Sequence, residues 1–308
     1  MAPTPTAGPG PVRLATRGSP LARWQATRVA ELLAQTAGTV EIVVVETTGD
    51  RRTDVPIAEI GGQGVFAREI QTAVLEGRAD LAVHSAKDLP ALTPPGLELA
   101  SVPERADPRD ALVGSRLEDL PTGATVATGS VRRRAQLAWL RPDLGFVELR
   151  GNMARRLERS EEVGAGVVAL AALDRLGLRD RVTEILEPSL LLPQVGQGAL
   201  AVECRADDAA TLALLAGIDD HGAHRALRAE RAFLAELGGG CSLPVGALAT
   251  LGPDGGIALE GLLASRDGRT VLRRTSTGDD PEVLGRRLAR DLLERDGGLA
   301  LADWGDHR

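Results

Sequence analysis

The chain has few cysteine, histidine and aromatic residues. Its 308 residues include two Cys, four His, three Trp, three Phe and no Tyr. Cys204 and Cys241 lie far apart in the sequence, which predicts reduced thiols and no disulfide framework. The histidines and cysteines do not recur at the spacing of metal ligands, so we predict no metal site. Because aromatic residues make up 2% of the chain, we expect cores built from Leu, Val, Ile and Ala.

Long apolar runs and an excess of basic residues are also missing. The longest apolar run, VGAGVVALAAL at 163–173, is too short to span a bilayer. The net charge of -7 argues against a general nucleic-acid binder, which needs a basic face. Residues 1–11, MAPTPTAGPGP, lack the basic and apolar segments of a signal peptide and predict a disordered leader. We therefore expect a cytoplasmic protein that binds neither membrane nor nucleic acid.

Lysine is almost absent, although basic residues are not. Of the 36 basic residues, Lys87 is the only lysine and the other 35 are arginines. A chain with this bias would accept Arg wherever a general positive charge suffices. Lys87 is then either a surface lysine retained by chance or a residue whose compact ammonium group is required at its position.

Strand and helix patterns alternate from residue 12 to about residue 200. Ser19 followed by Pro20 is typical of a helix N-cap and first helical position. Four prolines between residues 91 and 110 indicate a joint. The alternation predicts parallel α/β layers in two units of about 100 residues each. Strands are expected at 12–16, 40–48, 79–85, 124–128, 146–150 and 166–170, and helices at 66–77, at 131–140 and from residues 20 and 153.

The last third of the chain has a different pattern. A strong helix is predicted over 222–237, and apolar stretches follow it in VGALAT, GIALEGLLA and TVLRRT. Another helix is expected from about Asp280. This order predicts a small α+β domain with an antiparallel sheet.

The stretch AVHSAKDLP at 82–90 is the first candidate site. An apolar strand ends there in His, Ser, Lys and Asp, and ligands of α/β sheets bind beyond the carboxyl ends of strands. An ammonium group on Lys87 and a carboxylate on Asp88 in one cleft can do acid–base or charge-stabilising work. The plainer interpretation is a strand-to-turn exit with solvated polar residues.

Arginines gather after two later strands, in TGSVRRRAQ at 128–136 and LRGNMARR at 149–156. Cations in the first turn of a helix oppose its dipole, which favours a bound anion over the alternative of a solvated basic face. The usual nucleotide loops are missing, so carboxylates held by bidentate Arg are the favoured ligands. Seven arginines lie between 132 and 156: Arg132, Arg133, Arg134, Arg141, Arg150, Arg155 and Arg156.

Three glycine-rich loops are the remaining candidate functional sites. GGQG at 61–64 and VGQGAL at 195–200 are each weak signals on their own. In LGGGCSLPVG at 237–246, Cys241 follows three glycines, which puts a nucleophilic side chain on flexible backbone. Cys204 alternates with apolar residues and is interpreted as a small buried residue.

Together these stretches resemble the porphobilinogen deaminase (hydroxymethylbilane synthase) family over residues 12–250. The matching segments are LATRGSPLA, TTGD, GGQGVF, AVHSAKDLP, ADPRDAL, TGSVRRRAQ, LRGNMARRL, LAALDRLGL, LPQVGQGALAVECR and GGGCSLPVGA. The resemblance implies two α/β domains related to periplasmic binding proteins around a cleft, and a small α+β domain. These would be residues 12–103 with 199–220, residues 104–198, and residues 221–308.

The resemblance also implies the activity. A dipyrromethane cofactor would be bound to Cys241 by a thioether, and this transferase would add four porphobilinogen units one at a time with loss of ammonia. Hydrolysis would release hydroxymethylbilane for porphyrin and haem biosynthesis, and the enzyme would act as a monomer. Asp88 matches the catalytic carboxylate, which would stabilise an azafulvene-like cation.

The resemblance also implies binding roles for residues at other positions. Contacts to the cofactor are implied for Ser85, Lys87, Ser130, Arg132, Arg133, Arg150, Arg156, Gln197 and, beside the pyrroles, Phe66. Contacts to the substrate are implied for Arg17, Ser19, Arg150, Arg156 and Arg175. Gln63, Gly129 and Arg155 depart from frequent Lys, Ser and Thr, and the segment between Leu157 and Val167 is shorter than in some members.

Two other classes remain open from the residues alone. A non-catalytic, two-lobed protein that binds small organic anions would account for the first two domains but not for Cys241. A thiol hydrolase would need a histidine in a recognisable Cys–His context, and none is apparent.

Overall fold

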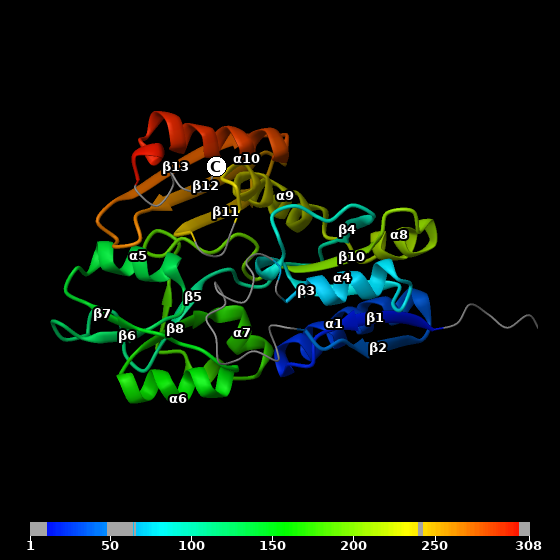
Figure 1. Cartoon of the computed structure of the whole chain (residues 1–308), viewed down its shortest axis with the longest axis horizontal. Helices are drawn as coiled ribbons and strands as arrows, with labels where there is room; N and C mark the ends of the chain where they lie inside the picture. Colours follow the sequence, from blue (N-terminus) through cyan, green and yellow to red (C-terminus); the bar gives the residue numbers. More distant parts are fainter. Residues whose placement is uncertain (1–10, 48–63, 65, 240–242, 302–308) are drawn as a thin grey trace, which may run out of the picture.

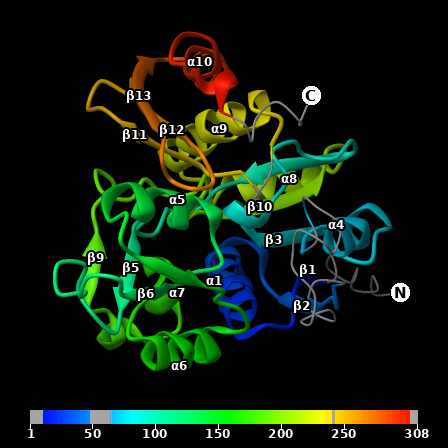
Figure 2. The same ribbon diagram turned by 60° about the vertical axis from the view of Figure 1, so that its left-hand side comes forward.

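The computed structural model describes residues 11–47, 64, 66–239 and 243–301. These residues form two five-stranded sheets with helices against them and one three-stranded sheet with its own helices (Figure 1). Figure 2 shows the same three groups of elements after rotation. Cys241, Gln63 and most of the predicted leader lie outside the described residues. Within the described residues, no helix is both long and apolar enough to cross a membrane.

The first sheet contains the N-terminal strands in the order β2-β1-β3-β10-β4. Its strands are β1 (Val12–Thr16), β2 (Val40–Val44), β3 (Leu81–Ser85), β4 (Leu97–Ser101) and β10 (Leu200–Arg205). Its helices are α1 (Pro20–Ala37), α4 (Arg68–Leu75) and α8 (Ala209–Ala216), and a single 3-10 turn, η1 (Ala86–Asp88), follows β3. Leu14, Leu33, Leu81 and Val202 pack in its core, which is aliphatic as predicted.

The second sheet has the order β7-β6-β8-β5-β9. Its strands are β5 (Asp110–Val113), β6 (Thr125–Ala127), β7 (Gly145–Val147), β8 (Gly166–Ala169) and β9 (Glu184–Leu186). Its helices are α5 (Val131–Leu140), α6 (Met153–Val163) and α7 (Leu170–Arg175), with a 3-10 turn η2 (Arg179–Arg181). Helix α5 begins and ends where the sequence predicts.

Both sheets are mixed, so the prediction of purely parallel layers is wrong. Strand β10 runs antiparallel to β3 and β4, and β5 runs antiparallel to β8 and β9. Each is the first strand after the chain crosses from one sheet to the other. The crossing segments, 102–109 and 187–199, stay at the edge where the preceding strands end, and Ala106 N–H donates to Gly198 O between them. The next strand must therefore start at that edge and run away from it.

The third sheet is antiparallel in the order β11-β12-β13, as the α+β pattern predicts. Its elements are β11 (Val245–Leu251), β12 (Ile257–Ala264), β13 (Val271–Gly278), α9 (His221–Glu236), α10 (Pro281–Arg290), a π turn η3 (Asp291–Arg295) and a 3-10 turn η4 (Gly298–Ala300). Gly285 lets α10 approach α9, because a Cβ there would lie 2.4 Å from Ala229 O. Phe233 and Leu259 are fully buried between helices and sheet.

Several sequence predictions need correction in detail, and the strand predicted at 146–150 is the shorter β7, which ends at Val147. The proline-rich joint at 91–110 contains β4, and its prolines lie on either side of the strand rather than in it. The strand predicted at 40–48 ends at Val44. The fold class is otherwise confirmed as two α/β units and one α+β unit.

Candidate active site

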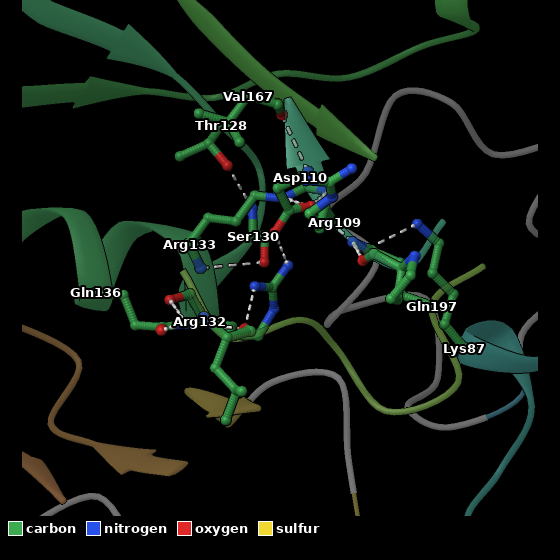
Figure 3. A network of polar contacts seen from close by, with 12 residues as sticks. Lys87, Arg109, Asp110, Thr128, Ser130, Arg132, Arg133, Gln136, Val167 and Gln197 are labelled. Atoms are coloured by element: carbon green, nitrogen blue, oxygen red, sulfur yellow. Dashed lines mark hydrogen bonds and ion pairs between the residues drawn. The ribbon is translucent and has the colours of Figure 1, made fainter. Parts of the chain in front are cut away.

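Asp110 is the centre of a buried network at the edge where the two larger sheets meet (Figure 3). Its Oδ1 accepts from Arg133 Nε at 3.0 Å and Nη2 at 2.7 Å, and its Oδ2 accepts from Arg132 Nη2 at 2.7 Å. The two arginines also donate to backbone carbonyls, Arg132 to Leu192 and Arg133 to Val167. The first-turn arginines of α5 thus meet an anion, and this anion belongs to the protein itself.

The network fixes the charge state of its members. Burial by itself would raise the pKa of Asp110, but the charges of Arg132 and Arg133 outweigh it and lower that pKa. Burial lowers the pKa of Arg132, and the nearby Asp110 opposes this change. We infer that Asp110 stays ionised and holds both guanidinium groups in place.

Gln197 connects this network to Lys87. Its Nε2 donates to Asp110 Oδ1 at 2.8 Å and to Pro108 O at 2.7 Å, while its Oε1 accepts from Lys87 Nζ at 3.4 Å. The flanking Gly198 has a φ of 86°, and a Cβ there would lie 2.4 Å from Ala106 O. The loop VGQGAL therefore needs glycine for its conformation and for close backbone contact.

Lys87 and Asp88 are neighbours in η1, yet they line different hollows. Lys87 lines a hollow that we call the central hollow, whose other lining residues include Arg132 of α5 and Val245 of β11. Burial and the charge of Arg133 lower the pKa of Lys87 to about 8. The two side chains line different hollows, yet the charge of Asp88 still acts to raise the pKa of Lys87, so the pair interacts as the sequence interpretation expects. The lining of the central hollow includes Lys87, Ser130, Arg132, Leu234, Leu243 and Val245.

Asp88 lines a second hollow within the first sheet's unit, which we call the side hollow. Arg17, Phe66 and Ser85 line it too, so four of the predicted site residues meet there. The Arg17 guanidinium lies over the Phe66 ring at 4.0 Å, a cation–π distance. A carboxylate, a cation and an aromatic ring thus line one hollow.

Both predicted serine ligands act as helix N-caps. Ser130 Oγ accepts from Arg133 N–H at the start of α5, and Ser19 Oγ accepts from Ala22 N–H at the start of α1. Ser130 also lines the central hollow, so capping and ligand contact are compatible there. Ser19 does not line the side hollow.

The three remaining predicted arginines differ in their burial and in their contacts. Arg175 is buried, which lowers its pKa to about 10, and its Nη2 donates to Gly198 O at 2.6 Å. Arg156 donates to Gly151 O, and burial and the charge of Arg133 lower its pKa. Arg150 lies 3.5 Å from Glu148.

Two departures from the family pattern also have a place in the structure. A Cβ at Gly129 would lie 2.9 Å from Leu149 O, so a serine there would need local adjustment. Arg155 is exposed, and its N–H is capped by Asn152 Oδ1. Gln63 lies outside the described residues.

Sequence reasoning does not identify Asp110 as a site residue. The available signal is a carboxylate directly before the apolar run ALV, with no polar residue to accompany it in the strand. Such a charge needs a partner when it is buried. Its partners are twenty-two residues and more away, which sequence spacing cannot reveal.

The central hollow suits a ligand with carboxylates on apolar rings. Arg132 Nε is buried without a hydrogen-bond partner, and Lys87 faces the same space. Leu234, Leu243 and Val245 add apolar side chains to the lining, and Leu243 follows Cys241 by two residues in the sequence. A dipyrromethane with its acetate and propionate groups meets both requirements. Among the described residues, no cluster of His, Cys, Asp and Glu could hold a metal ion.

Comparison with known proteins gives consistent results over nearly the whole chain. Residues 12–213 match the family model "Porphobilinogen deaminase, dipyromethane cofactor binding domain", and residues 224–294 match "Porphobilinogen deaminase, C-terminal domain". A porphobilinogen deaminase from Roseiflexus sp. is 49% identical over 94% of this chain and 98% of its own length. That of Acidothermus cellulolyticus is 48% identical over 92% and 88%.

Solved structures align more distantly. A methionine binding protein, MetQ, is 12% identical with a TM-score of 0.42, over 69% of this chain and 91% of that one. A TRAP periplasmic solute binding protein from Desulfovibrio salexigens is 13% identical with a TM-score of 0.42, over 69% and 72%. The sequence matches carry the assignment: this chain belongs to the porphobilinogen deaminase family and contains its dipyrromethane cofactor binding domain.

Proposed function

We propose that this chain is a transferase that condenses four porphobilinogen units head to tail on a dipyrromethane held by Cys241. Each condensation releases ammonia, and hydrolysis then frees hydroxymethylbilane. The observation that carries the proposal is that the buried Arg132 has an Nε without a hydrogen-bond partner and lines the central hollow together with Leu243. A donor in that position has an evident use only when an anionic ligand accepts from it.

In this proposal the central hollow binds the cofactor through the chain's own cations. Arg132 Nε and Lys87 Nζ donate to carboxylates, while Leu234 and Leu243 contact the pyrrole rings. Asp110 keeps Arg132 and Arg133 oriented, so little reorganisation is needed when a ligand binds. When bound, the dipyrromethane supplies the free pyrrole carbon to which new units are joined.

Asp88 is the proposed catalytic residue in the side hollow. Ammonia leaves the aminomethyl group of porphobilinogen with the electron pair of the carbon–nitrogen bond, so positive charge develops on the substrate. The Asp88 carboxylate stabilises this charge, and Arg17 binds a substrate carboxylate beside Phe66. The free pyrrole carbon of a bound dipyrromethane would supply the atom for the new carbon–carbon bond, and its proton would pass to solvent.

The decisive measurement is the intact mass of the purified protein. We expect wild type to be heavier than its sequence by one dipyrromethane, and Cys241→Ala to have the unmodified mass. Cys204→Ala is the matched control, because burial raises the pKa of this thiol to about 11 and disfavours the reactive thiolate. It should keep the adduct. A wild type of unmodified mass that still binds organic carboxylates would instead support a non-catalytic binding protein.

Finer features belong to the same proposal. We expect a cytoplasmic monomer that needs neither membrane nor nucleic acid. The proposed domains are 12–103 with 199–220, 104–198, and 221–308, and the grouping of the strands into three sheets supports this division.

A further inference from the structure

Helix α1 buries one polar side chain among small and aliphatic ones. Its inward face contains Ala22, Ala26, Val29 and Leu33, all at most 8% exposed. Gln25, at 3% exposed, belongs to the same face by helical spacing. A glutamine buried in such a face loses its hydrogen bonds to water and needs replacements.

Four glutamines of the described chain are buried, and they differ in one respect. Gln71 donates its amide to Glu203, Gln136 to Leu192 O and Gln197 to Asp110. The Nε2 of Gln25 has no hydrogen-bond partner. The protein therefore satisfies three of these side-chain amides and leaves the fourth available.

Gln25 belongs to the lining that contains the predicted catalytic carboxylate. It lines the side hollow with Asp88, Arg17, Phe66 and Ser85. Asp88 repels any carboxylate that enters this hollow, so carboxylate groups there need nearby donors. Arg17 supplies a charge, and the Gln25 amide supplies a neutral donor that does not compete for the Asp88 carboxylate as a second cation would.

We propose that Gln25 is a substrate-binding residue that donates its side-chain N–H to a carboxylate of the pyrrole in the side hollow. This inference rests on the proposed function, since it takes porphobilinogen as the ligand. Gln25 contacts a substituent and takes no part in bond making, so its effect should appear in KM rather than in kcat.

The test combines kinetics with thermal unfolding of the holoenzyme. Gln25→Leu should raise the KM for porphobilinogen about tenfold, the loss expected for one hydrogen bond to a charged group. Its kcat should stay within twofold of wild type and its adduct mass should be unchanged. Its Tm should equal or exceed that of wild type, because an unsatisfied buried amide is replaced by an apolar group of similar shape. Gln25→Glu should raise KM further through charge repulsion.

Gln35→Leu makes the same change at an exposed position of α1 and should leave KM unaltered. The inference is overturned if Gln25→Leu has the KM of this control, or if its Tm falls along with its activity, since a structural role would produce that fall. A wild type without adduct or turnover would instead contradict the proposed function.

Discussion

The central and side hollows are lined by consecutive residues of a single 3-10 turn, and they differ in charge. The central hollow offers the cations Lys87 and Arg132, and a buried carboxylate, Asp110, already balances Arg132 from behind. The side hollow offers the carboxylate of Asp88, with Arg17 beside it. Because Lys87 and Asp88 are consecutive, one turn of backbone presents opposite charges to two spaces.

This difference suggests that the two hollows have different functions. The central hollow is arranged to retain a ligand, because its cations are held rigidly and its other wall is apolar. The side hollow is arranged for a reaction in which positive charge develops, because an anion is available there. Variants on the two sides should therefore fail in different ways, and the following predictions test that difference.

The largest effect is expected for Asp110→Asn. It leaves Arg132 and Arg133 buried without their counter-charge, and breaking such a pair costs about 3–5 kcal/mol. We expect this loss in the free energy of unfolding, measured by denaturant titration, together with loss of the adduct in the intact mass. Asp143→Asn is the control, because it removes an ion pair with Arg141 that is partly exposed and should cost about 1 kcal/mol or less. Equal losses for the two variants would argue against a central role for Asp110.

Asp88→Asn should act on turnover alone. Removing a preorganised electrostatic group lowers kcat by about 10²–10³-fold, and we expect a loss of this size. The variant should fold and keep the adduct, because Asp88 does not line the central hollow. Steady-state rates and intact mass check both statements. Turnover close to that of wild type would remove Asp88 from the mechanism.

A smaller effect follows from the lowered pKa of Lys87. Burial and Arg133 lower it from 10.5 to about 8, so the folded chain releases this proton before the unfolded chain does. Stability should therefore rise with pH between about 8 and 10.5, and below pH 8 the buried ammonium is a penalty. In the adduct-free Cys241→Ala background, Lys87→Met should be more stable at pH 7 by up to about 3 kcal/mol.

That advantage should disappear as the pH approaches 10.5, which denaturant titrations at pH 7 and pH 10 would detect. Arg175 and Cys204 also titrate near this range, but both are present in the reference and in the variant, so their contributions cancel in the difference. A stability difference that does not change with pH would contradict the lowered pKa.

Local sequence signals predict elements well where short-range chemistry decides them. The Ser19–Pro20 start of α1 and the limits of α5 follow from capping and from the preference of Pro for the first helical turn. The mixed direction of β5 and β10 could not be predicted in this way. It depends on which edge of the sheet the crossing segments follow, and no local propensity records that.

The functional site, like the fold, could be predicted only in part from local sequence. The sequence by itself determined which residues are chemically available: a single lysine beside an aspartate, arginines after two strands, and a cysteine after three glycines. Only the tertiary structure decided their partners. It pairs Arg132 and Arg133 with Asp110, places Lys87 and Asp88 in the linings of two hollows, and leaves Gln25 beside Asp88 with an unused amide. The reason is physical: whether a charge is free or balanced depends on groups brought within hydrogen-bond distance by folding, across sequence separations that no motif spans.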